Sequence, residues 1–270
     1  MVTFYYMNYL VAIILGFVEG VTEFLPISSS GHLIIVRQML GVNDFGGLTF
    51  DAVLQLSATL AVVVYFWKDI LYLLITGFNL IRKNPVDIKE RSLFYSILIG
   101  TIPAVIFGLL LETYMESVFR NVHLVALTLI LGSILFWVAQ KVATKDKELS
   151  LGRGIAIGFF QCLALIPGVS RSGATISGGL ILGLSQEESV RFSFLLSIPI
   201  LLGAGLKKVF DVRHDLFTSA FGSPLLVGSI VAFITAILAI NFLIRYLRNN
   251  NLDIFIWYRI GLSLAIFLLF

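Results

Sequence analysis

Apolar runs of about twenty residues recur along this chain, and they restrict it to a protein whose helices cross a lipid bilayer. Composition agrees, because 58% of the residues are hydrophobic, 13% are charged and the mean hydropathy is +0.97. A soluble core of this length could not bury so much apolar side chain. Strand-like alternation is absent, so the spans are expected to be helices. They are expected at 50–67, 92–111, 124–139, 190–206, 225–244 and 254–270.

The remaining composition excludes several other classes of protein. Segment 1–8 has no Lys or Arg, so it lacks the basic start of a cleavable signal peptide and is expected to belong to the mature protein. Cys162 is the single cysteine and cannot form an intramolecular disulfide. A formal net charge of +3 is modest, so the basic residues are read as topology markers, and no nucleic-acid partner is expected.

Two segments of the chain repeat one pattern. Segment 15–32 reads L-G-F-V-E-G-V-T-E-F-L-P-I-S-S-S-G-H, and segment 157–175 reads I-G-F-F-Q-C-L-A-L-I-P-G-V-S-R-S-G-A-T. The S-S-S-G of the first aligns with the S-R-S-G of the second, and the prolines lie one residue out of step. Each segment leads from an apolar helix through a proline break and a hydroxyl-rich turn into a second apolar helix. Polar groups and broken backbone inside a membrane usually mark a functional site.

The repeat predicts the fold. Three spans follow each motif, and an odd number makes the second copy enter the membrane from the opposite side. We therefore expect an all-α polytopic membrane protein with an inverted-topology repeat, each half being a re-entrant broken helix hairpin plus three transmembrane helices. The chain would be a single membrane domain over 1–270, with repeat one at 1–142, repeat two at 152–270 and a charged cytoplasmic link at 143–151. The two motifs would then meet near the midplane of the membrane.

The basic residues predict the orientation, since cytoplasmic loops carry an excess of Lys and Arg. This span count places on the other side chiefly Arg120, Lys207, Lys208 and Arg213, so the first hairpin would open to the outside. The prediction requires that segment 1–25, which is long enough to cross the membrane, does not cross fully. The cytoplasmic group comprises Lys68, Arg82, Lys83, Lys89, Arg91, Lys141, Lys145, Lys147, Arg153, Arg245 and Arg248.

Glu19 and Glu23 lie four residues apart on an otherwise apolar helix, so they share one face. Two carboxylates in a membrane helix repel each other and need a cation, a proton or water. The pair is read as a divalent-metal site or as an acid/base pair. The alternative is an interfacial helix start with solvated glutamates.

Ser28, Ser29, Ser30 and Gly31 follow Pro26, where the break lets a new helix begin. Unpaired N–H groups at that helix start suit an anion such as phosphate. A serine hydroxyl can bind a phosphate oxygen or act as a nucleophile, whereas helix capping alone explains one serine but hardly three. The next residue, His32, is read as a general base or acid within reach of Ser29.

Arg171 is the residue of the second motif that most clearly indicates a binding site, because an arginine inside a membrane must pair with an anion. Its planar guanidinium suits a phosphate, and Ser170, Ser172 and Thr175 flank it as further phosphate-binding groups. The alternative is an ion pair with Glu19 or Glu23 that joins the repeats. The aromatic residues Trp67, Trp257 and Tyr258 fit membrane-interface anchors.

With both motifs in view, the chain resembles the undecaprenyl-diphosphatase family, the bacitracin-resistance type of integral-membrane phosphatase. The resemblance rests on E-G-V-T-E-F-L-P-I-S-S-S-G-H together with P-G-V-S-R-S-G-A-T and extends over essentially the whole chain. It implies hydrolysis of undecaprenyl pyrophosphate to undecaprenyl phosphate and inorganic phosphate, which recycles the lipid carrier for peptidoglycan synthesis. It implies the outer side of the bacterial plasma membrane. The family motifs map onto Glu19, Glu23, Ser29 and His32, and onto Ser170, Arg171 and Thr175.

The residues of the two motifs and the family resemblance together suggest a hypothesis for the mechanism. Arg171 and the backbone N–H groups of both turns would hold the diphosphate, and Glu19 and Glu23 would bind Mg²⁺ or Ca²⁺. Ser29 would attack the terminal phosphorus or position a water that does so, and His32 would manage the proton. The residues themselves do not separate serine attack from water attack.

Other functions compete with hydrolysis. Inverted repeats with broken helices are typical of transporters, so a carrier or flippase for a phosphate-bearing lipid or solute is the main alternative. A purely structural membrane protein would leave the intramembrane Arg171 and the paired glutamates without a purpose. Glycine-rich stretches at 178–179 and 203–205 permit close helix packing within one bundle or between two copies, so a homodimer is left open.

Overall fold

In the computed structural model, residues 8–42, 47–117, 121–211 and 222–270 are described, and every regular element in them is a helix. Segment 1–7 and the basic residues Arg120 and Arg213 lie outside the described residues. The first half contains α1 (Tyr9–Phe24), α2 (Ser29–Met39), α3 (Gly47–Tyr65), α4 (Trp67–Ile81), α5 (Ile88–Ser117) and α6 (Val122–Val142). The second half contains α7 (Leu151–Cys162), a 3₁₀ turn (Leu163–Leu165), α8 (Arg171–Ile181), α9 (Gln186–Asp211), α11 (Gly222–Asn249) and α12 (Asp253–Leu269).

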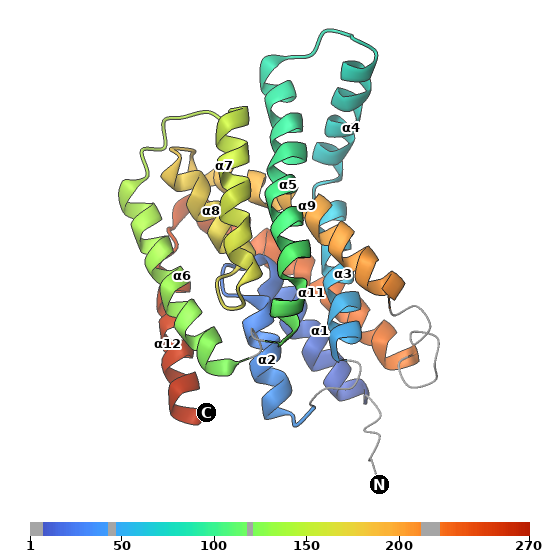
Figure 1. The fold of residues 1–270 in the computed structure, drawn as a ribbon, viewed down its shortest axis with the longest axis vertical. Coiled ribbons are helices and arrows are strands. Elements are labelled where there is room, and N and C mark those ends of the chain that lie inside the picture. The colour runs from blue at the N-terminus through green and yellow to red at the C-terminus, as the bar shows by residue number, and fades with distance from the viewer. Residues whose placement is uncertain (1–7, 43–46, 118–120, 212–221) are drawn as a thin grey trace.

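The apolar helices confirm a polytopic membrane protein. Among the described residues, four helical stretches are long and apolar enough to cross a membrane, at Ile88–Leu111, Val122–Val142, Gln186–Phe210 and Gly222–Asn249. A fifth span results if α3 and α4, which are bent by 78° at their junction, are counted together. The run expected at 254–270 forms α12, which lies alongside α6 (Figure 1). That α12 crosses the membrane stays a prediction.

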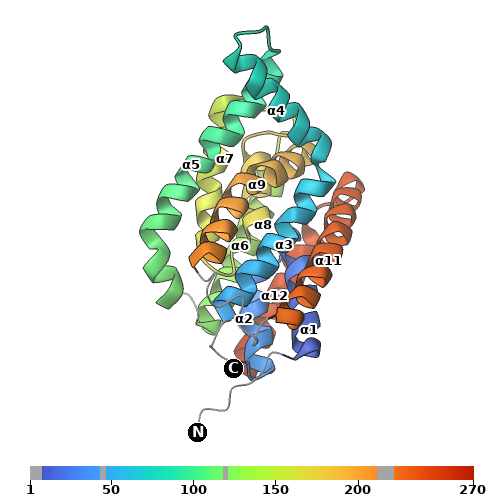
Figure 2. The same ribbon diagram turned by 90° about the vertical axis from the view of Figure 1, so that its right-hand side faces the viewer.

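The segment after α3 differs from the sequence interpretation, in which one span ends at residue 67, the next begins at 92 and the stretch between them, 68–91, is a polar connection. Trp67 instead starts α4, which continues to Ile81, so the connection is confined to residues 82–87. The charges of Lys68 and Asp69 stand in the first turn of α4, where the carboxylate pairs with Arg191 of α9, and the rest of the helix is mainly apolar. Figures 1 and 2 show α4 and the start of α5 projecting together beyond the other helices.

Two helix hairpins enter the bundle from opposite ends. Figure 1 shows α1 and α2 at the end where the C-terminus lies, whereas α7 and α8 come from the other end. Their turns face each other at mid-height. The connections α4–α5 and α6–α7, which carry many of the basic residues, lie at the end opposite the C-terminus. This arrangement is the one expected of an inverted repeat, while its orientation in a membrane stays a prediction.

Each hairpin packs against a long helix of the other half, since α1 lies along α11 and α7 lies along α5. Glycines make both approaches possible. A Cβ placed on Gly16 would overlap the carbonyl oxygen of Gly228, and one on Gly158 would overlap the carbonyl oxygen of Gly100. Backbones in membrane proteins approach this closely only through small residues. The same packing device therefore fixes both hairpins.

We expect Gly16→Ala to destabilise the protein by about 1–3 kcal/mol, because the added methyl group forces α1 away from α11. The matched control is Gly203→Ala in α9, where the added methyl group meets no atom within 4 Å. Both changes bring the same gain in helix propensity, so their difference isolates the clash. Thermal unfolding in detergent measures it, and equal midpoints for the two variants would contradict the packing argument.

Candidate active site

The first turn is built by a proline and a capping serine. Pro26 cannot continue α1, which ends at Phe24. Ser28 then takes a left-handed conformation, with φ of 75°, and its hydroxyl accepts a hydrogen bond from the N–H of Gly31 at 3.3 Å. This cap starts α2 at Ser29. The first N–H groups of α2 have no acceptor within their own helix, which makes this end suitable for an anion.

The second turn has the same construction. Pro167 precedes Gly168, and Ser170 caps α8 with φ of 76° while accepting from the N–H of Gly173 at 3.2 Å. The positive φ of Ser28 thus recurs at its counterpart in the sequence repeat. The repeat read in the sequence is therefore a repeat of backbone geometry at these two turns.

The two turns are bonded directly to each other. The N–H of Gly168 donates to the hydroxyl oxygen of Ser28 at 3.1 Å, and the hydroxyl of Ser172 donates to the carbonyl oxygen of Leu25 at 3.2 Å. The serines Ser28 and Ser172 are buried. The expectation that the two motifs meet in space is confirmed, and these two hydroxyls serve to join them.

Glu23 connects the charged and nucleophilic residues of the two turns. Its Oε1 pairs with Nη2 of Arg171 at 3.3 Å, and its Oε2 accepts the hydroxyl of Ser29 at 2.5 Å. The side chains of Glu23 and Arg171 are only 4% and 10% exposed, so solvent screens this ion pair weakly. The pairing weighed in the sequence as an alternative for Arg171 is present, and it holds Ser29 as well.

Arg171 keeps part of its hydrogen-bonding capacity unused. Its Nε and Nη1 are buried and have no hydrogen-bond partner among the described residues. Nearby on the other turn, Ser29 is partly exposed and Ser30 is exposed. Buried donors are rarely left without acceptors, and a guanidinium offers two parallel donors to a phosphate. The arrangement can accept an oxyanion between Arg171 and the start of α2.

Glu19 lies one turn before Glu23 and is only 2% exposed. No hydrogen-bond or ion-pair partner of its carboxylate is found in the part of the chain that the structure describes. Glu23, Asp51 and Arg171 lie close enough to act on it electrostatically. Asp51 itself pairs with Arg37 at 2.5 Å. Two further carboxylates, each paired with an arginine, thus act on a buried third one, which needs a proton or a cation.

The predicted divalent cation can be tested against these donors. Within the described residues, no group of three or more His, Cys, Asp or Glu side chains is arranged to hold a metal ion. Mg²⁺ is commonly bound by one or two carboxylates together with substrate phosphates. Glu19 and Glu23 therefore fit a cation that is completed by phosphate oxygens, and they do not form a closed protein site. The cation stays a prediction.

His32 contacts different groups from those expected. Its Nδ1 lies 2.7 Å from the carbonyl oxygen of Ser28, and its Nε2 lies 2.7 Å from the hydroxyl of Tyr258 on α12. A carbonyl oxygen only accepts, so Nδ1 carries a proton and, in the neutral ring, Nε2 accepts from Tyr258. Glu23, not His32, holds the hydroxyl of Ser29. A role for His32 in moving a proton stays a prediction.

The other predicted phosphate-binding residues are mostly engaged within the protein. The hydroxyl of Ser170 lies 3.2 Å from that of Ser172, and both side chains are buried. The hydroxyl of Thr175 lies 2.5 Å from that of Ser193 on α9. Gly31 is packed against Val125 of α6. Phosphate binding by these side chains stays a prediction, and Ser30 is the exposed hydroxyl among them.

Two residues of α12 were missed by the sequence interpretation. Tyr258, read as an interface anchor, bonds to His32, and Arg259 is completely buried against both turns. Both lie outside the repeated motifs. The sequence did contain a sign of the role of Arg259, since it is a charged residue within the last apolar run. An ionisable residue inside a membrane is a functional candidate by default.

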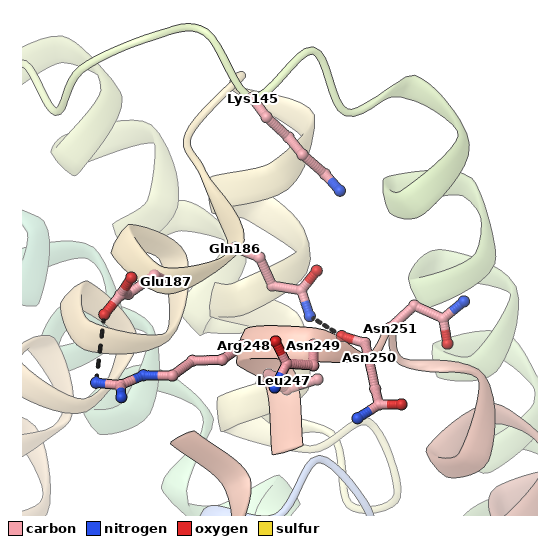
Figure 3. Close-up of a pocket in the computed structure, with 8 residues that line it drawn as sticks. All are labelled: Lys145, Gln186, Glu187, Leu247, Arg248, Asn249, Asn250 and Asn251. Atoms are coloured by element: carbon pink, nitrogen blue, oxygen red, sulfur yellow. Dashed lines mark hydrogen bonds and ion pairs between the residues drawn. The ribbon is translucent and has the colours of Figure 1, made fainter. Parts of the chain in front are cut away.

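A broad surface cavity lies elsewhere in the molecule. It has a volume of about 750 Å³ and contains no residue of the two turns. Figure 3 shows its polar lining, in which Gln186 donates to the carbonyl oxygen of Asn250 and Arg248 pairs with Glu187. Its lining comes from the α6–α7 connection, the start of α9, the end of α11 and the α11–α12 turn. This cavity is separate from the candidate site.

Comparisons with known proteins agree with one another. The family model described as bacitracin resistance protein BacA matches residues 12–265. A protein of Moorella thermoacetica is 43% identical over 267 residues, covering 98% of this chain and 98% of the relative. A protein of Myxococcus xanthus is 42% identical over 269 residues, with 97% and 89% covered, and one of Renibacterium salmoninarum is 39% identical over 270 residues, with 97% and 96% covered. Each of these relatives is named undecaprenyl-diphosphatase.

We expect Ser28→Ala to destabilise the protein by about 1–2 kcal/mol, because it removes a helix cap and leaves the N–H of Gly168 without its acceptor. Ser30→Ala, at an exposed neighbouring position, should change stability by less than about 0.5 kcal/mol. Thermal unfolding of both variants in one detergent provides the comparison. Equal stability of the two would show that the bond between the turns contributes little.

Proposed function

This chain belongs to the family of bacitracin resistance protein BacA, and on that premise we propose that it hydrolyses undecaprenyl pyrophosphate to undecaprenyl phosphate and inorganic phosphate. The names of its relatives and their identity over nearly the whole chain support this activity. The product would return the lipid carrier to peptidoglycan synthesis in the cell wall. The family's name connects the same activity with bacitracin resistance.

One observation carries the proposal: Glu23 bridges Arg171 of one repeat and Ser29 of the other. A cation, a carboxylate and a hydroxyl thus meet inside an apolar bundle. This combination suits a substrate with a lipid tail and a strongly anionic head. The apolar helices would accept the tail, and the two turns would accept the diphosphate.

Substrate binding would begin with an exchange of anions at Arg171. The terminal phosphate would take the unused Nε and Nη1 donors of the guanidinium and weaken the ion pair with Glu23. The first N–H groups of α2 and α8 would hold further phosphate oxygens. Because one anion replaces another beside the same cation, the exchange leaves Arg171 paired throughout.

The exchange would also release Glu23 for proton transfer. In the proposed step, Oγ of Ser29 attacks the terminal phosphorus, its proton passes to Oε2 of Glu23, and the bond to the bridging oxygen breaks. Undecaprenyl phosphate leaves, and a water then cleaves the phosphoserine to inorganic phosphate and free serine. The alternative is direct attack by a water that Ser29 and Glu23 position.

The divalent cation is proposed to be held by Glu19 and Glu23. When bound, Mg²⁺ or Ca²⁺ would neutralise charge on the phosphate oxygens. Burial of Glu19 without a partner among the described residues supports a cation at this position. His32, bonded to Tyr258, would act on a proton of the leaving phosphate or of the attacking water in the second step.

We further propose that the protein lies in the bacterial plasma (inner) membrane with the first hairpin open to the periplasmic or extracellular side. The basic connections α4–α5 and α6–α7 at the opposite end support this orientation, since cytoplasmic loops are rich in Lys and Arg (Figure 1).

A carrier or flippase is the second candidate, because hairpins that enter from opposite ends are typical of transporters. A carrier needs groups that bind phosphate. It does not need a serine hydroxyl held by a carboxylate, so the contact between Ser29 and Glu23 favours the hydrolase.

We expect purified protein in detergent to release phosphate from undecaprenyl pyrophosphate, and Arg171→Ala and Glu23→Gln each to lower kcat by about 10²–10³-fold. Either change removes a charge from the reacting centre. The measurement is inorganic phosphate release with no membrane gradient.

The matched controls are Arg191→Ala and Glu187→Gln, whose charges pair at the surface with Asp69 and Arg248 and should leave kcat nearly unchanged. Ser29→Ala distinguishes serine attack from water attack, because substantial remaining activity would exclude a phosphoserine. Folded wild-type protein that binds the lipid but releases no phosphate would favour the carrier.

Chelation tests the cation. We expect EDTA to abolish phosphate release and added Mg²⁺ or Ca²⁺ to restore it, because without the cation the carboxylates of Glu19 and Glu23 would repel the diphosphate. Glu19→Gln should raise the metal concentration needed for half-maximal rate by about 10–100-fold. Full activity in EDTA would contradict a metal at Glu19 and Glu23.

A further inference from the structure

Arg259 of α12 is 0% exposed, and in the described chain no carboxylate pairs with it. Its guanidinium instead donates to oxygen atoms of the backbone and of one serine. On α6, Nε bonds to the hydroxyl of Ser133 at 3.2 Å and Nη2 bonds to the carbonyl of Leu129 at 3.1 Å. Its face lies 4.7 Å from the ring centre of Phe136. A buried arginine without a carboxylate calls for an explanation, since burying a charge is costly.

The remaining donors of Arg259 bind both turns. Nη1 donates to the carbonyl oxygen of Pro26 at 3.4 Å, and Nη2 donates to that of Gly168 at 2.9 Å. Pro26 and Gly168 are equivalent positions of the repeat, each two residues before its capping serine. One guanidinium therefore holds the same carbonyl in both copies.

These carbonyls lie just beyond the C-terminal ends of α1 and of the helix and 3₁₀ turn at 151–165. Such ends carry a partial negative charge and leave carbonyl oxygens without partners. Within an apolar bundle such carbonyl oxygens are satisfied mainly by donors of the protein itself. The guanidinium of an arginine offsets the partial negative charge and, with its planar fork of donors, also satisfies several carbonyl oxygens. A lysine could do so only in part.

We propose that Arg259 is a positioning residue for the hydrolysis, holding the two turns in the register that brings Glu23, Ser29 and Arg171 together. The inference rests on the proposed function. Arg259 acts through the carbonyls of Pro26 and Gly168 and touches neither phosphate nor nucleophile. Its removal should therefore impair the chemical step while leaving the apolar tail site intact.

A plain structural role is the competing explanation, in which Arg259 merely attaches α12 to α6. The chain offers a matched control for it. Ser263, one turn further along α12, is also fully buried and donates to the carbonyl oxygen of Ala126 on α6 at 2.8 Å. It attaches the same two helices without contacting either turn.

The test compares Arg259→Met, Arg259→Lys and Ser263→Ala in detergent, with kcat, KM for undecaprenyl pyrophosphate and the thermal midpoint measured for each. We expect Arg259→Met to lower kcat by about 100-fold with KM changed less than about threefold, as for loss of a group that orients reactants. Arg259→Lys should recover part of the loss. Ser263→Ala should keep kcat within about twofold even if its midpoint falls.

A second pair of variants moves the guanidinium without deleting it. A Cβ on Gly132 of α6 would overlap Nη2 of Arg259, whereas a Cβ on Gly261 of α12 would meet no atom within 4 Å. Gly132→Ala should lower kcat by about tenfold and Gly261→Ala should not, because a small displacement of positioning groups is enough to slow a reaction.

A readout without turnover separates this inference from the proposed function. In a Cys162→Ala background, Ser29→Cys provides a single thiol whose labelling by a water-soluble maleimide reports the first turn. Adding Arg259→Met should raise the labelling rate by about tenfold, and adding Ser263→Ala should not. Wild-type protein that releases no phosphate would contradict the hydrolase alone. Unchanged labelling, or kcat of Arg259→Met within threefold of wild type, would overturn the positioning role.

Discussion

A backbone that breaks inside an apolar bundle must find hydrogen-bond partners within the protein, and the rest of this structure follows from that requirement. Two helix hairpins break at Pro26 and Pro167, within this bundle. Each turn supplies partners to the other, through the N–H of Gly168 and the hydroxyl of Ser172. The meeting of the two repeats is thus the condition under which either break is stable. A polar site at their junction is a consequence of closing the breaks.

The arrangement of the two hairpins also separates positive from negative partial charge at their junction. The helix ends that enter the junction carry partial negative charge and face the cation of Arg259, while the helix starts that leave it carry partial positive charge. Against this common frame the repeats have diverged. Ser29 and Arg171 stand at equivalent positions, and so do Glu19 and the buried, unpartnered Gln161. A repeated turn that carries a serine in one copy and an arginine in the other therefore places a hydroxyl and a cation close together.

The apolar runs predicted most of the spans, because length and hydrophobicity are local properties. The meeting of the two motifs was predicted from the sequence repeat and an assumed three spans per half; the structure confirms the meeting, and the inverted topology stays a prediction. The hydrogen-bond partners of individual side chains were harder to predict from the sequence. His32 was expected beside Ser29 on grounds of spacing, but its ring nitrogens bond to Ser28 and Tyr258. Arg259 belongs to no recognisable motif, and it donates hydrogen bonds to carbonyl oxygens of three segments that are far apart in the sequence. The helix α4 was missed because two charges at its start hid the apolar face that follows.

Capping alone does not explain the three serines of the first turn. Each of them has a different environment in the structure. Ser28 caps α2 and accepts from the other turn, Ser29 lies against Glu23, and Ser30 is exposed. Two demands that often conflict, rigid closure of the backbone and access for a ligand, thereby fall on different hydroxyls. Because the serine that closes the turn is not the one that contacts Glu23, the anion exchange proposed at Arg171 would not require the junction between the two turns to open.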